Sequence, residues 1–466
     1  MAVAEGSTSA VQAPRTNAGE DYPSTARAWY SVIVLLIAYI LSFIDRQILN
    51  LLVGPVRRDL GITDTQMSLL IGLSFALFYS CLGLPFGRLA DFVNRPRLIA
   101  LGVLTWSFMT GGCGLVKSYR QLFLLRMGVG IGEAALSPAA YSMIADSFPP
   151  AKRSVPFSVY TTATYVGGGI AFLFGALLLR AFAARETLAL PLVGPTRPWQ
   201  ILFLILGASG IAFVFLLLTL RDPSRKGARL AESRGGKCKV ERVSLRSVVA
   251  YFIQNRTTLL SLNFGMGFVA LAAYGSSAWG ITFLVRNHHM SAPQAGILFG
   301  GAQAISGSVG MLAAGKLVSW LMHRGYRDAY MRVAVLSTIA WFLPGILFPL
   351  IPNATASVAV LYVSVVFLCV PTFVIPAAIL ELVPNAMRGQ ATALYLLIVN
   401  MIGLGIGPTA VALVTDRVFG YDAAVRYSLV IVPVAACLLA AILFLKGLRS
   451  YSQSLDRLHA WLQANL

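Results

Sequence analysis

Four charged residues interrupt the apolar runs of this sequence, and they are the first candidates for chemistry. Asp45 and Arg46 are adjacent in "YILSFIDRQILNLL", and Arg126 and Glu133 stand seven residues apart in "LFLLRMGVGIGEAAL". Because seven residues make about two turns of an α-helix, Arg126 and Glu133 share one helix face. A charge at the middle of a membrane helix costs about 2.5–3.5 kcal/mol. We therefore expect the four groups to be paired with one another or hydrated.

A buried ion cluster of this kind has two interpretations. It either pins two helices together, or it takes part in proton transfer and anion binding. Apolar side chains would join the helices without the cost of desolvating charges, so we favour a functional cluster. Burial raises the pKa of a carboxyl group and neighbouring cations lower it. The sequence alone does not decide which effect prevails at Asp45 or Glu133.

The composition indicates that these charges lie in a membrane. The 466 residues are 57% hydrophobic and 12% charged, with a mean hydropathy of +0.74, whereas soluble domains carry about 25% charged residues. Runs of about 20 apolar residues recur along the whole chain, and each is long enough to cross the hydrocarbon core. The sequence thus predicts an all-α, multi-pass integral membrane protein.

Other classes of protein fit the sequence poorly. The net charge of +19 is explained by Lys and Arg at the cytoplasmic ends of membrane helices. No basic stripe alternates with aromatic residues, so nucleic acid is not an expected partner. The five cysteines show no metal-binding spacing. We also find no nucleophile–base set and no nucleotide loop, and we expect neither an enzyme nor a metal site.

Hydropathy windows of about 19 residues predict twelve membrane helices in two bundles of six. Their expected ranges are 29–54, 65–87, 97–117, 120–146, 154–182, 198–220, 257–285, 293–320, 330–351, 355–383, 390–415 and 422–447. The predicted division is a disordered cytoplasmic tail (1–27), an N-terminal bundle (28–220), a basic cytoplasmic linker with an amphipathic helix (221–256), a C-terminal bundle (257–448) and a cytoplasmic amphipathic tail (449–466). Lys and Arg concentrate on the side of the termini, so both termini are expected in the cytoplasm and the protein in the plasma membrane, or the inner membrane of a bacterium.

Two short repeats relate the halves. "DSFPPAKR" (146–153) and "ELVPNAMR" (381–388) align without gaps at the ends of the fourth and tenth predicted helices. Two parallel six-helix repeats around a basic central loop resemble the major facilitator transporters. In that architecture a substrate site lies near the midplane, between the halves.

A further stretch, "GRLADFVNRPR" (87–97), resembles the signature G-x-L-A-D-R-x-G-R-R of that superfamily. Phe92 stands where Arg is usual and Asn94 where Gly is usual; Asn tolerates the left-handed backbone that Gly favours. The resemblance implies a conformational latch that stabilises the outward-facing form. The residues assigned to it, with the two repeats, are Gly87, Asp91, Arg95, Arg97, Asp146, Arg153, Glu381 and Arg388.

The stretches "SFIDRQILNLL" and "RMGVGIGEAALSPAAYSMIADSFPPAKR" resemble the spinster family of this superfamily. The resemblance implies that Asp45 is the proton-titrating acid, that Arg46 is its neighbour, and that Arg126 and Glu133 are the charged pair of helix four. Members move lysophospholipids or sphingosine-1-phosphate, which join an anionic head to an apolar tail. The expected function is therefore proton-coupled, alternating-access transport of an amphiphilic anion, with the proton as coupling ion and no other cofactor.

The mechanism expected from this cluster is competition for partners. Ionised Asp45 pairs with Arg46 or Arg126, and a proton arriving at Asp45 frees an arginine for the anionic head of the substrate. Asp45 and Glu133 are thus the proton-coupling candidates, and the two arginines are the substrate candidates. Nine more residues are candidates for lining the cavity, although each also suits a packing role. They are Tyr160, Thr164, Tyr165, Tyr274, Ser277, Trp279, Gln303, Tyr395 and Asn400.

Two alternatives remain open. A carrier of polar organic anions, sugar acids or drugs would need polar side chains in its second half, but the tenth helix, "VLYVSVVFLCVPTFVIPAAIL", is almost wholly apolar. A membrane sensor or scaffold would not need charges at the centres of helices one and four. The expected partners are a small-molecule or lipid substrate and membrane lipids, and the expected state is a monomer.

Overall fold

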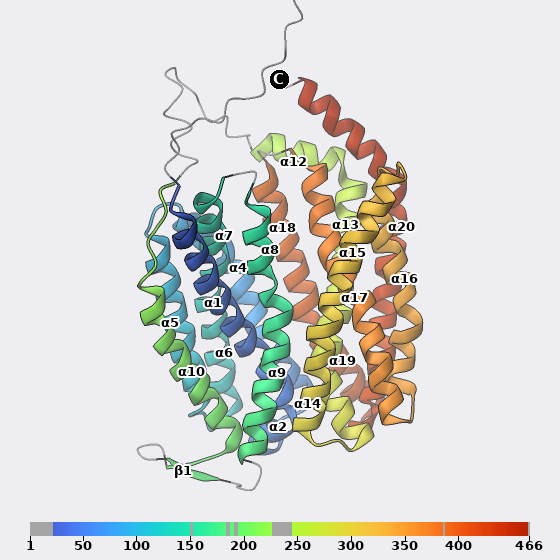
Figure 1. Ribbon diagram of the computed structural model, residues 1–466. Coiled ribbons are helices and arrows are strands. Elements are labelled where there is room, and N and C mark those ends of the chain that lie inside the picture. The colour runs from blue at the N-terminus through green and yellow to red at the C-terminus, as the bar shows by residue number, and fades with distance from the viewer. Residues whose placement is uncertain are drawn as a thin grey trace, which may run out of the picture.

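The computed structural model describes residues 22–149, 152–182, 187–190, 194–225, 245–384 and 387–464. These residues form long helices packed side by side, apart from one small hairpin (Figure 1). Eleven helical segments are long and apolar enough to span a membrane. The 19-residue helix α5 (Arg95–Cys113) completes the expected twelve. Within the described residues the predicted all-α membrane fold, with its two six-helix bundles, is confirmed.

The N-terminal bundle contains six membrane segments, three of which are split by a short break. Its helices are α1 (Thr25–Leu51), α2 (Val53–Leu60), α3 (Asp64–Ile71), α4 (Leu73–Ala90), α5, α6 (Tyr119–Glu133), α7 (Leu136–Ser147), α8 (Ser154–Thr161), α9 (Ala163–Phe182) and α10 (Pro198–Leu217). Between α9 and α10, β1 (Leu188–Leu190) and β2 (Gly194–Thr196) pair antiparallel. The sequence predicts no strand there.

The C-terminal bundle follows the amphipathic helix α12 (Leu245–Gln254), which the linker was predicted to contain. Its elements are α13 (Arg256–His288), α14 (Ala292–Gly301), η2 (Ala302–Ser306), α15 (Gly307–His323), α16 (Ala329–Leu350), α17 (Ala354–Leu382), α18 (Arg388–Val399), η4 (Asn400–Ile406), α19 (Gly407–Leu413), η5 (Val414–Phe419), η6 (Asp422–Ala424) and α20 (Val425–Ala464). The elements η2, η4 and η5 are π-helical. Such turns are frequent at functional sites.

Polar caps explain where several helices begin. Thr63 and Gln66 form a capping box at the start of α3, each side chain accepting from the other's backbone N–H. Asn94 caps α5 by accepting from the N–H of Arg97 at 3.0 Å. Its φ is −64°, so the left-handed backbone considered for this position is not adopted. Asn94 is accommodated in the superfamily signature because it satisfies a free helix donor.

The two ends of the molecule differ, and each is named here by what lies at it (Figure 1). The start of α1, helix α12 and the C-terminus lie at one end, the linker end, and the β1–β2 hairpin lies at the other, the hairpin end. A buried apolar core shared by both bundles includes Leu51, Phe172 and Phe299. The rings of Phe172 and Phe299 meet edge to face at 5.6 Å. Because α1 and α9 end and α14 begins near the hairpin end, this shared core joins the bundles on that side.

At the linker end the C-terminal tail and α12 pack on the second bundle. The tail was predicted as a separate interfacial helix, but α20 runs without interruption to Ala464. The hydroxyl of Tyr251 in α12 donates to the carbonyl of Leu382 at 2.6 Å. Burial raises the pKa of Tyr251 to about 12, so this hydroxyl stays a hydrogen-bond donor at neutral pH. The contact anchors the linker to the end of α17.

Candidate functional site

An ion pair joins α1 to α6 inside the N-terminal bundle. Nε of Arg46 lies 2.7 Å from Oε2 of Glu133, and the hydroxyl of Ser42 donates to the same oxygen at 2.5 Å. The Arg46 guanidinium also lies over the rings of Phe75 and Tyr79, 4.6 and 4.4 Å from their centroids. Aromatic faces attract cations. The positive charge of Arg46 is therefore balanced by the Glu133 carboxylate and stabilised by the two aromatic rings.

Asp45 and Arg126 are buried near this pair but do not join it. Nη1 of Arg126 donates to the backbone carbonyl of Asp45 at 3.2 Å. Oδ1 of Asp45 and Nε and Nη2 of Arg126 have no hydrogen-bond partner among the described residues. The expected pairing of Asp45 with Arg46 or Arg126 is thus absent from the described part of this conformation. Neighbouring helical residues point about 100° apart, so Arg46 turns toward Glu133 and Asp45 does not.

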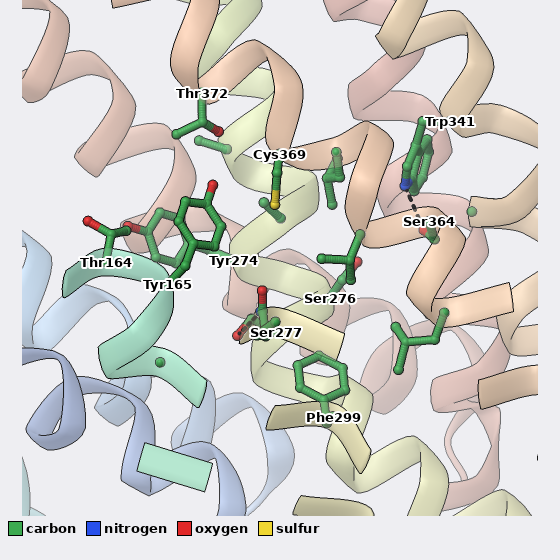
Figure 2. A pocket seen from close by; sticks show the side chains of 18 of the residues that line it. Thr164, Tyr165, Tyr274, Ser276, Ser277, Phe299, Trp341, Ser364, Cys369 and Thr372 are labelled. Atoms are coloured by element: carbon green, nitrogen blue, oxygen red, sulfur yellow. Dashed lines mark hydrogen bonds between the residues drawn. The ribbon is translucent and has the colours of Figure 1, made fainter. Parts of the chain in front are cut away.

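A cavity of about 150 Å³ lies between the two bundles. Figure 2 shows Thr164 and Tyr165 on one side of it, and Ser364 and Trp341 on the other. The first two come from α9, and the others from α17 and α16. No charged side chain is among the residues that line this cavity. Its wall is mostly apolar, with a few hydroxyl and carboxamide groups.

The structure places five of the nine candidate lining residues on this cavity. They are Thr164, Tyr165, Tyr274, Ser277 and Gln303. The four that do not line it are Tyr160, Trp279, Tyr395 and Asn400. Tyr160 stacks on Tyr39 with ring centroids 4.8 Å apart, and the indole N–H of Trp279 donates to the carbonyl of Pro408 at 2.9 Å. Both side chains pack between helices, because their positions on the helix turn them away from the cavity.

Sequence reasoning missed Gln47, which the structure places on the cavity wall. Its Oε1 accepts from Asn50 at 2.6 Å and from the hydroxyl of Ser277 at 3.4 Å. Gln303 in turn lies 3.5 Å from the same hydroxyl. A polar chain therefore crosses from α1 to α13 and η2. The available signal was the position of Gln47 directly after Arg46, inside an apolar run.

The charge cluster and the cavity are neighbours. A second, much smaller pocket of about 10 Å³ is lined by Arg46 together with Phe43, Gln47 and Tyr274. The last three residues also line the main cavity. These shared residues place the surroundings of Arg46 next to the central cavity.

A second ion cluster ties the two bundles together at the hairpin end. Asp64 of α3 binds the guanidinium of Arg286 with both oxygens, at 2.5 and 2.8 Å. Arg57 lies 3.2 Å from the same carboxylate and 2.7 Å from Asp422 of the other half. Burial lowers the pKa of Arg57, but Asp422 and Asp64 outweigh it and raise that pKa above its ordinary value. The cluster therefore stays charged and holds the bundles together.

Another contact strengthens this closure. The backbone N–H and the hydroxyl of Thr65 both donate to Asp416, each at 2.7 Å. Thr65 belongs to α3 and Asp416 to η5, so this link also spans the two halves. These residues are not conspicuous in the sequence, because charged residues near the ends of membrane segments are common.

At the linker end the candidate latch residues bind within one half. Arg95 is fully buried and contacts Asp146 at 2.5 Å and Asp222 at 2.6 Å. Asp91 is exposed, and its backbone carbonyl accepts from Arg225. Its carboxylate has no partner among the described residues. Among the described residues, Asp91 therefore makes no hydrogen bond or ion pair with the other half.

The remaining latch candidates also bind locally. Arg153 donates to the carbonyl of Phe148 at 2.8 Å, and Arg388 donates to that of Leu380 at 3.1 Å. Glu381 accepts from the hydroxyl of Tyr451 at 2.6 Å. The other two candidates contact their own half: a Cβ at Gly87 would lie 3.6 Å from Pro138, and Arg97 is exposed at the start of α5.

These contacts define the conformation. Ion pairs and a shared apolar core join the bundles at the hairpin end, whereas the ion pairs described at the linker end all lie within one half. The bundles are thus closed on the hairpin side. A latch that stabilises the opposite form would be released here, which agrees with the local contacts of Arg95 and Asp91.

Two helical bundles with a cavity between them, closed at one end by ion pairs, define a membrane transporter of the alternating-access architecture. The chain belongs to the Major Facilitator Superfamily, whose family model matches residues 35–408. It is a transporter and not an enzyme. Within the superfamily it is spinster-like, so the resemblance found in the sequence is confirmed.

Several known proteins are similar to it. An MFS-type efflux pump of Mycolicibacterium smegmatis is 28% identical over 71% of this chain and 72% of its own length. A probable L-galactonate transporter of Escherichia coli is 24% identical over 73% of this chain and 72% of its own length. A spinster homolog 1 of Xenopus tropicalis is 25% identical over 83% of this chain and 73% of its own length. The crystal structure of a bacterial homologue of the human lysosomal transporter spinster, in an inward-facing and unoccupied conformation, is 26% identical. It covers 93% of this chain and 99% of its own, with a TM-score of 0.79.

Arg46 and Glu133 should stabilise the protein cooperatively, so that each contributes more when the other is present. Removing one partner of a buried pair leaves an unpaired charge and costs about 3–5 kcal/mol, so Arg46→Gln and Glu133→Gln should each lower the thermal stability of the purified protein strongly. The double variant should lose clearly less than the sum of the two. The matched control is the more exposed pair Arg332–Asp328, for which the same cycle should give about 0.5 kcal/mol. Strictly additive losses at Arg46 and Glu133 would contradict an energetic pair.

The ion cluster at the hairpin end should control opening on that side. Asp64→Asn removes the charge shared by Arg57 and Arg286, so the population closed at this end should fall. Spin labels at Lys117 and Thr355, both exposed, in a background free of native cysteines would report a longer distance by pulsed electron resonance. Asp456→Asn, which removes an exposed pair within the second half, should leave the distances unchanged. Equal distance distributions for Asp64→Asn and the parent protein would show that the cluster is not a gate.

Proposed function

We propose that this protein is a proton-coupled transporter that carries an amphiphilic organic anion of the lysophospholipid or sphingoid-phosphate type by alternating access. The observation that carries the proposal is the position of the cavity. A mostly apolar chamber with no charged lining residue lies directly beside the buried Arg46–Glu133 pair. The apolar wall matches the tail of such an anion in chemistry, and the buried arginine matches its head.

The division of the site between the halves supports an amphiphile. The second half contributes apolar wall residues such as Leu361, Val365 and Leu368 from α17. The first half contributes the charges. Burial of apolar surface contributes about 25 cal/mol of favourable free energy per Å². An alkyl chain therefore gains affinity from its contacts with the second half alone. A charge-assisted hydrogen bond from Arg46 would then select an anionic head.

Proton coupling rests on Asp45. Its side chain is buried, 4% exposed, and one carboxylate oxygen has no partner among the described residues. Arg126 lies close by with two unused nitrogens. In the proposed cycle a proton on Asp45 removes its charge, Glu133 and the arginines redistribute their contacts, and Arg46 becomes free for the substrate head. Loss of the proton reverses the exchange.

Alternating access follows from the ion cluster at the hairpin end. In this conformation Arg57, Asp64 and Arg286 close that end, so the cavity is reached from the linker end. Basic residues concentrate on the linker side, and by the positive-inside rule this favours termini in the cytoplasm. The conformation is then inward-facing, in the plasma membrane or a bacterial inner membrane. In the opposite state Asp91 and Arg95 would take over as the latch.

A second candidate function is transport of a sugar acid. It is favoured by the polar chain of Gln47, Ser277 and Gln303 on the cavity wall, which offers hydroxyl-binding groups. The relative from Escherichia coli described above is named a probable L-galactonate transporter. The mostly apolar wall of the cavity makes this candidate the weaker one, because such a wall suits an alkyl chain better than the many hydroxyl groups of a sugar acid.

A substrate panel tests the cargo. Proteoliposomes should accumulate a labelled lysophospholipid or sphingoid phosphate and not L-galactonate. Ser364→Trp narrows the apolar side of the cavity and should lower lipid uptake at least tenfold. The control Leu343→Trp changes an exposed residue of α16 that faces away from the protein and should leave uptake unchanged. Uptake of galactonate in preference to the lipids would overturn the lipid assignment and favour the second candidate.

A single substitution tests the coupling. Asp45→Asn keeps the shape of the side chain but cannot gain or lose a proton, so substrate counterflow should survive while uptake driven by a pH gradient falls to the level without a gradient. Ser42→Ala removes a neutral partner of Glu133 and should keep the response to the gradient. Gradient-driven uptake by Asp45→Asn equal to that of the parent protein would rule out coupling through this residue.

A further inference from the structure

A groove of about 540 Å³ lies outside the central cavity, between α12, α13 and α18. The two sites share no lining residue. Eight of the eleven lining residues are apolar. The groove is lined by Val248, Val249, Phe252, Ile253, Arg256, Leu259, Leu260, Asn263, Gln390, Leu394 and Ile398. It belongs entirely to α12 and the second bundle, so it is distinct from the site between the halves.

The groove is polar at its linker end and mostly apolar beyond it, with Asn263 as a polar residue at its far end along α13. Arg256 and Gln390 stand near the starts of α13 and α18, both of which begin at the linker end. From there the lining continues for seven residues along α13, to Asn263, and for eight along α18, to Ile398. At 1.5 Å per residue these distances are about 10 and 12 Å. One leaflet of a bilayer provides about 15 Å of hydrocarbon, so the groove matches an acyl chain of that leaflet.

Apolar side chains in the groove are left uncovered by the protein. Val249 and Ile253 of α12 are 48% and 58% exposed, and Leu260 of α13 is 50% exposed. On the same helix α12, Val248 and Tyr251 pack into the core of the second bundle. The helix therefore presents apolar residues to the protein and also to the groove. A molecule with an alkyl chain is the ligand that this surface fits.

The charge at the mouth of the groove selects an anion. Arg256 is exposed, and it is the one charged residue among those that line the groove. A basic residue close to an anionic lipid surface contributes about 1 kcal/mol. An anionic headgroup is therefore the complementary partner.

We propose that this groove binds one anionic glycerophospholipid of the leaflet at the linker end, with its phosphate at Arg256 and an acyl chain between α13 and α18. The lipid is a resident of the membrane and not the cargo, so the proposal does not rest on the function proposed above.

Native mass spectrometry of the full-length protein tests the binding. Titration with phosphatidylglycerol should give one tightly bound lipid, retained about fivefold better than phosphatidylcholine, the preference expected from a single basic contact. Arg256→Gln should remove this preference. Arg449→Gln, which changes an exposed arginine of α20 outside the groove, should keep it. An unchanged preference in Arg256→Gln would overturn the proposal.

A second experiment fills the groove with a larger side chain. Leu394→Trp, or Leu260→Trp if the first variant fails to elute as a single folded species, should abolish retention of both lipids. Leu312→Trp, which changes a residue of α15 that is 65% exposed, should bind as the parent protein does. Retention by both groove variants equal to the parent would overturn the proposal. A dimer that the parent protein forms and the groove variants lose would also overturn the proposal, because the occupant would then be a second copy of the chain. Neither measurement needs transport, so failure here is distinguishable from failure of the proposed function.

Discussion

The cost of placing charge inside a membrane is the constraint on which this structure depends. Arg46 and Glu133 meet that cost by pairing at 2.7 Å across α1 and α6, with aromatic rings over the guanidinium. An apolar contact would hold these helices together at lower cost. We propose that the pair is one half of an exchange of partners and not only a structural contact. Asp45 and Arg126 lie beside it with unused hydrogen-bonding atoms, and these are the groups with which new contacts can be made.

The two halves of the molecule contribute different kinds of residue to the site. The first bundle holds the buried charges, and the second bundle holds most of the apolar wall of the cavity. Alternating access needs the halves to separate at one end while they remain joined at the other. Here Asp64 and Arg286 join them at the hairpin end, and the acids at the linker end bind Arg95 within the first half. Carboxylate–guanidinium contacts thus join the halves at one end, and the proposed function assigns the same chemistry to substrate and proton.

Much of the architecture was predictable from the sequence, and the site only in part. The twelve helices, the repeat and the four charges follow from apolar runs of fixed minimum length and from the rarity of charge within them. The side of a helix that faces the cavity is less visible, because the membrane makes every face apolar. Trp279 was therefore expected on the cavity and packs on Pro408 instead. Gln47 was missed and stands at the boundary between cavity and charge cluster.

By itself the sequence determined that the chain crosses a membrane, that it is built from two related halves and that a few charges lie within them. These properties are local, because helix length, hydropathy and repeat spacing are read along the chain. The tertiary structure alone decided that Arg46 binds Glu133 and leaves Asp45 without an ionic partner among the described residues. It also decided that Asp64 and Arg286, 222 residues apart, close one end. Partner choice depends on which helix faces meet, and hydropathy does not encode the rotation of one membrane helix against another.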